Sequence, residues 1–216
     1  MTDRMDPAGM TAKDSTRAVH PSALTGLLLA GGAGRRLGGC AKGLVHWRGR
    51  TLAEHALARL EPAAEVLISA NEYAADYARY GCRLIADPQP GLGPLGGVVA
   101  GLAAARTPWL LTAPCDAPLL PADYLARMTA GAPHSQRPRV AYAGGRLHPT
   151  CLLLHHGLLE DLEDYLRQGA RSMYGWLEQL RPERVHFSVA EAFTNINTPD
   201  DLERLLTHHG VAARDA

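Results

Sequence analysis

Short apolar runs alternate with segments of helical periodicity along the first 130 residues. Each run is bounded by turn-forming residues, as expected for strands buried on both faces. The expected strands are 23–30, 64–70, 82–87 and 108–116. The helical patterns occupy 51–60, 72–80, 93–106 and 121–130. Strands and helices in this order predict an α/β fold: a single domain with an open, mainly parallel sheet and helices on both faces.

The second half of the chain is less regular. A Gly144-Gly145 pair divides an apolar stretch and predicts a hairpin of two strands. Thr198 stands before a helical pattern with proline and acidic residues in its first turn, so it is the expected N-cap. The expected elements are the hairpin 138–154, helical segments within 157–180, a strand at 184–189 and a helix at 198–209.

Composition narrows the class of protein. A length of 216 residues and an apolar share of 46% suit one domain, expected over 23–207 between mobile tails at 1–22 and 208–216. A formal net charge of zero gives no case for a nucleic-acid or acidic-membrane partner. No apolar run approaches the roughly 20 residues of a membrane span. The four cysteines have no metal-binding spacing, which favours reduced thiols in the cytoplasm.

A glycine-rich loop follows the first apolar run, in the sequence LLLAGGAGRRLGGCAKG (27–43). Its glycines let backbone N–H groups approach an anion closely, which suits phosphate. Of the 22 basic residues in the chain only Lys13 and Lys42 are lysines, and Lys42 lies in this loop. The spacing matches neither a dinucleotide-binding fingerprint nor a P-loop. A tight turn with solvated arginines is the alternative interpretation.

Two carboxylates follow predicted strands. Asp116 ends the run 108–116, and Asp87 ends the run 82–87 just before Pro88. The carboxyl ends of parallel strands share one edge of a sheet with the glycine loop. A carboxylate there suits Mg²⁺, which binds few protein carboxylates together with phosphates. A turn or capping role is the alternative for Asp116, and an Asp-Pro turn for Asp87.

The loop resembles that of nucleotidyltransferases, and the molybdenum cofactor guanylyltransferase family in particular. The ordered motifs ISAN (68–71), IADP (85–88), GPLGG (93–97), PCDAP (114–118), HPT (148–150) and NINTPDDL (195–202) extend the resemblance over residues 24 to 206. It implies a Rossmann-like nucleotidyltransferase fold and transfer of GMP from GTP to the terminal phosphate of molybdenum-molybdopterin. The implied partners are GTP, this pterin, and proteins that deliver the pterin or mature molybdoenzymes.

The resemblance also implies residue roles. Lys42, Arg36 and Asp116 are the expected catalytic residues, with Mg²⁺ on Asp116. The expected nucleotide-binding residues are Leu29, Ala30, Gly31, Gly32, Lys42, Ser69, Asp87 and Asp116. His148, Asn195 and Asn197 are expected near the acceptor substrate, although a core histidine and turn or cap asparagines are the alternatives.

The chain departs from the family pattern at two positions: Ser69 replaces a customary asparagine, and Ala41 a customary aspartate. Three other functions stay open: a molybdopterin cytidylyltransferase, a sugar-nucleotide pyrophosphorylase and a non-catalytic nucleotide-binding protein. Cytidylyltransferases typically read L-A-A-G where this loop reads L-A-G-G, and the additional glycine favours a purine nucleotide. Lys42 and Asp116 together favour catalysis over simple binding.

Overall fold

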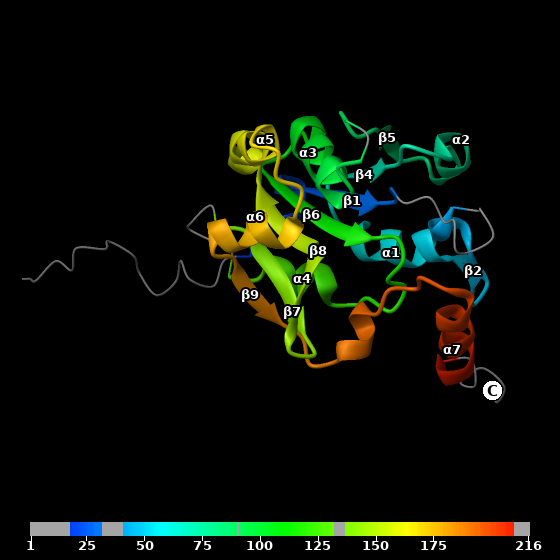
Figure 1. Ribbon diagram of the computed structural model, residues 1–216. Coiled ribbons are helices and arrows are strands. Elements are labelled where there is room, and N and C mark those ends of the chain that lie inside the picture. The colour runs from blue at the N-terminus through cyan, green and yellow to red at the C-terminus, as the bar shows by residue number, and fades with distance from the viewer. Residues whose placement is uncertain (1–17, 32–40, 90, 132–136, 210–216) are drawn as a thin grey trace, which may run out of the picture.

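The computed structural model describes residues 18–31, 41–89, 91–131 and 137–209. Among these residues, seven strands form one sheet in the spatial order β5-β4-β1-β6-β8-β7-β9 (Figure 1). Neighbouring strands are parallel except where β8 runs against β6 and β7. The strands are β1 (Leu24–Leu29), β4 (Glu65–Ser69), β5 (Arg83–Ile85), β6 (Trp109–Pro114), β7 (Arg139–Ala143), β8 (Arg146–His155) and β9 (Glu183–His186).

Helices cover both faces of this sheet (Figure 1). Because successive strand residues point to opposite faces, β1 contributes to two cores. Leu24 and Leu28 pack in the cluster that includes residues of α1 (Leu52–Leu60) and α4 (Tyr124–Thr129). Leu27 and Leu29 pack in the cluster on the other face. That second cluster includes residues of α3 (Pro94–Ala104), α5 (Leu159–Arg167) and α6 (Met173–Leu180). The predicted fold class is confirmed.

The hairpin predicted at Gly144-Gly145 is also confirmed. Both glycines have positive φ, 57° and 77°, as a tight hairpin turn requires. Because β8 runs antiparallel to β6, the first residues of β8 lie beside the carboxyl end of β6. There the Thr112 hydroxyl donates to the Thr150 carbonyl oxygen at 2.7 Å. The reversed strand therefore carries residues 148–150 to the edge of the sheet where the glycine loop begins.

Two elements are shorter than predicted, and one element was not predicted. The expected helix 72–80 is a short α2 (Ala74–Tyr77) followed by a 3₁₀ turn, which Gly81 ends at φ 69°. The expected strand 184–189 is only β9. A small hairpin of β2 (His46–Trp47) and β3 (Arg50–Thr51) was not anticipated, because two-residue strands carry no periodicity.

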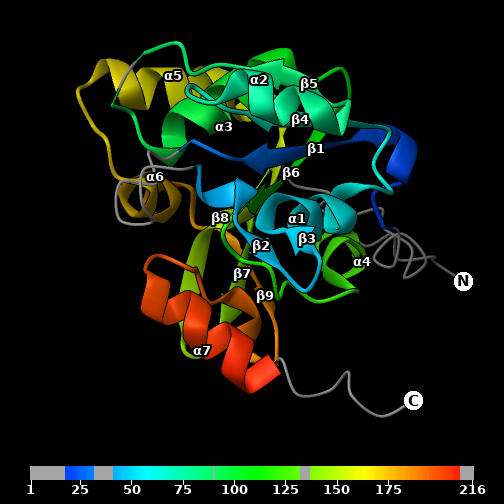
Figure 2. The same ribbon diagram turned by 90° about the vertical axis from the view of Figure 1, so that its right-hand side faces the viewer.

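The last helix, α7 (Pro199–His209), lies beside the β2–β3 hairpin rather than on the sheet (Figure 2). Trp47 and Leu52 form a small separate core with Ile196 and Leu205. The Thr198 hydroxyl accepts the Asp201 N–H at 3.2 Å, which confirms the predicted N-cap. This docking sets the position of the NINTPDDL segment.

Part of the expected N-terminal tail packs against the domain. Val19, inside the expected N-terminal tail, is buried, and its N–H donates to the Thr129 carbonyl at 3.1 Å. Residues 1–17 and 210–216 of the expected tails lie outside the described residues.

Within the described residues, none of the helices has the length and apolar character needed to cross a membrane.

Gly26 allows β1 and α1 to approach closely. A Cβ added at Gly26 would lie 2.9 Å from the Cβ of Leu60, an atom that cannot move without its helix. We expect Gly26→Ala to lower the free energy of unfolding by about 1–3 kcal/mol, as overpacking usually does. Gly101→Ala is the matched control, since its Cβ would meet only terminal atoms of Leu27 and Leu110. Urea unfolding of both variants tests this, and equal losses would contradict it.

Candidate active site

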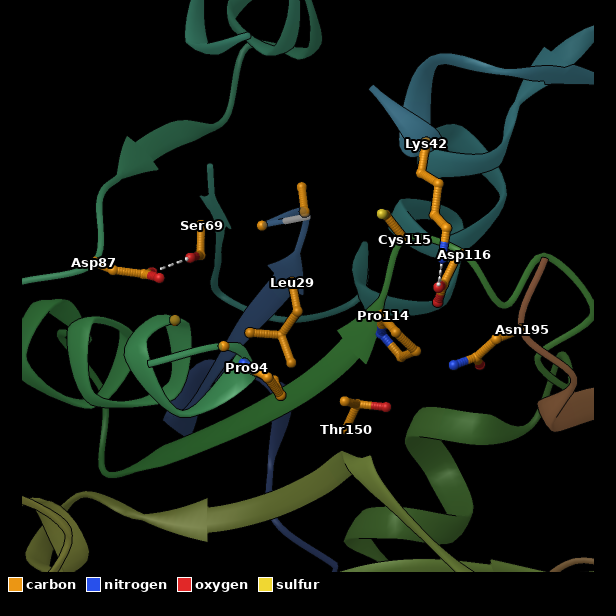
Figure 3. A pocket seen from close by; sticks show the side chains of 14 residues that line it. Leu29, Lys42, Ser69, Asp87, Pro94, Pro114, Cys115, Asp116, Thr150 and Asn195 are labelled. Carbon is orange, nitrogen blue, oxygen red and sulfur yellow. Dashed lines mark hydrogen bonds and ion pairs between the residues drawn. The ribbon is translucent and has the colours of Figure 1, made fainter. Parts of the chain in front are cut away.

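A pocket lies at the carboxyl ends of β1, β4 and β6, where parallel α/β sheets bind ligands. The start of α3 closes one side of it, so the positive end of that helix dipole faces the pocket (Figure 3). The residues that line it are Leu29, Ala30, Gly31, Lys42, Ser69, Asp87, Gly93, Pro94, Gly97, Pro114, Cys115, Asp116, Thr150 and Asn195.

The pocket unites most of the predicted nucleotide-binding residues. It contains Leu29, Ala30 and Gly31 from the loop start, and Lys42, Ser69, Asp87 and Asp116 from four other segments. Two predicted residues, Gly32 and Arg36, lie outside the described residues. Pro94, Pro114 and Thr150 also line the pocket, and the sequence analysis had given them no role. All three belong to quoted motifs, GPLGG, PCDAP and HPT, which were the available signal.

Lys42 makes the central contact of this site. Its ammonium nitrogen lies 2.9 Å from Asp116 Oδ2, and the two side chains are 21% and 14% exposed. It also donates to Asn197 Oδ1. Asp116 and Asn197 are 74 and 155 residues away in the sequence. A single compact cation therefore joins the glycine loop, the end of β6 and the start of α7.

The residue after Lys42 packs tightly against buried side chains. A Cβ at its neighbour Gly43 would lie 2.5 Å from Tyr77 Oη and 3.2 Å from Cys115 Cβ, so only glycine fits there. Tyr77 is fully buried, and burial raises the pKa of its hydroxyl. Burial, and then the nearby Asp116 carboxylate, raise the pKa of Cys115 to about 12. Cys115 therefore remains a neutral thiol and is not a nucleophile at neutral pH.

Asp201 fixes Asn197 on the other side of the lysine. Its Oδ2 accepts the N–H groups of Asn197 and Thr198, both at 2.9 Å. The hydrogen bond from the Asn197 N–H lowers the pKa of Asp201 most, and the hydrogen bonds with Thr198 lower it further. The sequence predicted only that this carboxylate lies in the first turn of a helix, and its contact with Asn197 was not predicted.

Asp201 gives a pH-dependent prediction. Because its pKa is lower in the folded state, its contribution to stability is complete above the unfolded pKa, near 4, and is lost as pH falls through the folded value. We expect Asp201→Asn to lower the free energy of unfolding at pH 7 by about 0.5–1 kcal/mol, typical of a lost helix cap. Thermal unfolding at pH 7 and near pH 2 tests this, with Asp200→Asn as control. If the wild-type protein and Asp201→Asn still differed in stability near pH 2, the prediction would be wrong.

A hydrogen-bonded cluster occupies the other end of the pocket. Ser69 Oγ donates to Asp87 Oδ1 at 3.1 Å, and Asn71 Nδ2 donates to Asp87 Oδ2 at 2.8 Å. The Asp87 N–H donates in return to Asn71 Oδ1 at 2.8 Å. Asn71 had been quoted only as part of the ISAN motif, and its contact with Asp87 was not foreseen. Figure 3 shows Ser69 and Asp87 together, well apart from Lys42 and Asp116.

A second hollow adjoins the first, and Thr150 and Asn195 line both. His148 and Asn197, two of the expected acceptor residues, line it together with Arg146 and Tyr174. His148 is buried, with Nε2 3.3 Å from the Ala143 carbonyl and its ring 4.6 Å from that of Phe193. Burial lowers the pKa of His148, so its imidazole is neutral at pH 7. It is both a packed core histidine and a wall of this hollow.

The Lys42–Asp116 pair beside a glycine-rich loop, together with a second adjoining hollow, suits a nucleotidyltransferase. Residues 26–184 match the family described as the MobA-like NTP transferase domain. The chain is 41% identical over 204 residues to a molybdenum cofactor guanylyltransferase of Ralstonia nicotianae, covering 87% of this chain and 98% of that protein. It is 41% identical over 187 residues to one of Cupriavidus pinatubonensis, covering 83% and 94%.

A solved structure agrees with these relatives. The molybdopterin-guanine dinucleotide biosynthesis protein A of Archaeoglobus fulgidus superposes with a TM-score of 0.67 at 26% identity, covering 83% of this chain and 95% of that one. The chain belongs to the molybdenum cofactor guanylyltransferase family.

Proposed function

We propose that this protein transfers GMP from GTP to the terminal phosphate of molybdenum-molybdopterin, yielding molybdopterin guanine dinucleotide and pyrophosphate. The Lys42–Asp116 pair carries the proposal, because it lies in a pocket that begins at the glycine loop. The adjoining hollow supplies a place for a second substrate, since Thr150 and Asn195 form a shared wall. A simple nucleotide-binding protein needs no such second hollow.

The chemistry requires alignment and charge neutralisation. An oxygen of the acceptor phosphate attacks the α-phosphorus of GTP, and the bond from that phosphorus to the bridging oxygen of the β-phosphate breaks. A phosphate monoester is already anionic at neutral pH, so no strong general base is needed. Lys42 offsets the charge that develops on pyrophosphate, together with Arg36, whose role rests on the loop pattern alone. A compact ammonium suits this position between phosphates.

A divalent cation fits the carboxylate of Asp116. Lys42 engages only Oδ2, and Oδ1 has no hydrogen-bond partner within the described part of the chain. That part contains no cluster of three or more histidine, cysteine or acidic side chains suited to a metal. A single carboxylate ligand is typical of Mg²⁺, which otherwise keeps waters and binds substrate phosphates. When bound, Mg²⁺ would supply positive charge to those phosphates.

The second hollow is the proposed acceptor site. His148, Asn195 and Asn197 contribute neutral hydrogen-bonding groups, and Arg146 contributes positive charge suited to an anionic pterin. Arg146 makes no ion pair with any described residue. The proposal includes a cytoplasmic location, with proteins that deliver the pterin and mature molybdoenzymes as partners. The buried, unpaired thiols of Cys115 and Cys151 suit a reducing compartment.

A nucleotide panel tests the function. Purified protein is incubated with Mg²⁺, molybdenum-molybdopterin and GTP, CTP or ATP, and pyrophosphate release and the dinucleotide product are measured. We expect release only with GTP and the pterin together. Faster turnover with CTP would favour the cytidylyltransferase alternative. Turnover with a sugar phosphate but not the pterin would favour a pyrophosphorylase, and binding without turnover would leave a nucleotide-binding protein.

A further inference from the structure

Tyr77 of α2 packs against the turn that carries Lys42. A Cβ added at Gly43, the residue after the lysine, would lie 2.5 Å from Tyr77 Oη and 3.3 Å from Tyr77 Cε1. The same added atom would lie 3.2 Å from Cys115 Cβ, and Cys115 directly precedes Asp116. The buried ring of Tyr77 therefore lies where the neighbours of both members of the Lys42–Asp116 pair meet.

Backbone hydrogen bonds hold both chain segments that meet at this ring. The Cys115 N–H donates to the Leu29 carbonyl at 3.1 Å, which ties the residue before Asp116 to β1. The Lys42 carbonyl accepts the Val45 N–H at 3.2 Å, which closes the turn that begins at the lysine. Because both segments are held and share one buried neighbour, the size and place of that ring set the separation of the lysine from the aspartate.

Tyr77 is itself fixed by its own helix and by Tyr80. Its N–H donates to the Tyr73 carbonyl at 3.1 Å, and its ring centroid lies 6.1 Å from that of Tyr80. The Tyr80 hydroxyl lies 2.8 Å from the Thr51 hydroxyl, which is the N-cap of α1. The ring therefore could not move away from the lysine turn without disturbing its contacts with Tyr80 and, through them, the start of α1.

The hydroxyl of Tyr77 adds nothing to stability. Within the described residues it has no hydrogen-bond partner of good geometry. A buried hydroxyl without a partner destabilises a fold, so a phenylalanine would be at least as stable here. Burial also raises the pKa of Tyr77, so the group stays neutral. What the oxygen contributes is its size, since it is the atom of the ring system that lies nearest to Gly43.

We propose that Tyr77 is a positioning residue for Lys42: its hydroxyl, packed against Gly43, holds the ammonium at the separation from Asp116 that the reaction requires. This inference rests on the proposed nucleotidyl transfer. Lys42 offsets charge that develops as pyrophosphate leaves, so a displaced ammonium weakens the transition state more than the bound ground state. Loss of the hydroxyl should therefore lower kcat more than it raises the KM for GTP.

Tyr77→Phe removes only the oxygen. We expect kcat to fall about tenfold, the KM for GTP to stay within about twofold of wild type, and the melting temperature to stay unchanged or rise. Tyr165→Phe is the matched control. Tyr165 is also buried and lines neither the pocket nor the second hollow, but its hydroxyl donates to the Ser172 carbonyl at 2.9 Å. The control should lose stability and keep wild-type kcat.

A Lys42→Ala background shows whether Tyr77 acts through the lysine. Adding Tyr77→Phe to Lys42→Ala should lower kcat by less than about twofold, because no ammonium remains to be positioned. A purely structural role would cost the same factor in both backgrounds. A further loss of about tenfold in Lys42→Ala, or unchanged kcat for Tyr77→Phe alone, would overturn the inference.

A second readout requires no turnover. Because Lys13 and Lys42 are the only lysines, protein labelled with ¹³C at lysine Cε gives one ε-methylene NMR signal from each, and Lys13→Arg assigns them. Tyr77→Phe should shift the Lys42 signal and leave that of Lys13 in place, and an unmoved Lys42 signal overturns the inference. If Tyr77→Phe does not fold, Gly43→Ala decides by the same signal, since its methyl group would press on the same hydroxyl. A shifted Lys42 signal in a protein that transfers no GMP would remove only the proposed function.

Discussion

Replacing Asp116 with alanine is expected to lower kcat by about 10²-fold to 10³-fold while leaving the domain folded. Preorganised charge at a reacting phosphate is commonly worth this much. The side chain is 14% exposed at the end of β6 and pairs with Lys42, so its loss removes the proposed metal ligand rather than core packing. Asp116→Asn should lose nearly as much activity, because an amide keeps the shape and loses the charge.

Steady-state kinetics over a range of Mg²⁺ concentrations provide the measurement. Asp123→Ala is the matched control, since that aspartate is 58% exposed and pairs only with Arg127 on the surface of α4. It should retain wild-type activity. A fall of less than about tenfold for Asp116→Ala, equal to about 1.4 kcal/mol of barrier, would contradict the metal role.

Lys42→Arg is expected to be nearly as damaging as Lys42→Ala, with about a 10²-fold loss of kcat/KM for each. The Lys42 ammonium contacts Asp116 and Asn197 together, on a turn whose next residue has no space for a Cβ. A guanidinium is planar and broader, and its fork prefers two parallel contacts to one carboxylate. Arginine would therefore supply the correct charge in an unsuitable shape.

The test compares kcat/KM and thermal unfolding of both variants. Lys13→Arg, the same substitution at the only other lysine in the sequence, is the control. Melting temperatures should change little, because Lys42 is partly exposed and adds little packing. Activity close to wild type in Lys42→Arg would mean that the loop requires only a positive charge.

Local patterns determined much of the fold in advance. The apolar runs predicted the strands that became β1, β4, β5 and β6, and the glycine pair predicted the β7–β8 hairpin. Thr198 marked a helix start, and its side chain caps as expected. These signals are short-range: a hydrophobic period, a turn conformation and a cap each involve only a few neighbouring residues.

Residue types, combined with one rule of sheet topology, also predicted where the pocket lies. Parallel strands end at one edge, so the glycine loop, Asp87 and Asp116 were expected together, and the pocket contains Gly31 with both carboxylates. Ser69, which the family resemblance placed there, also lines it. The roles of these residues in binding and catalysis stay predictions. The roles of Gly32 and Arg36 also stay predictions, without a described position.

Only the tertiary structure decided which distant groups meet. Asn197 reaches Lys42 because α7 docks on the β2–β3 hairpin through Trp47 and Leu205. Asn71 holds Asp87 because β4 and β5 are neighbours in register, and Thr150 reaches the pocket because β8 is inserted in reverse. No local period encodes such contacts. They depend on how complete elements bury their apolar faces against one another, which is a property of the whole folded chain.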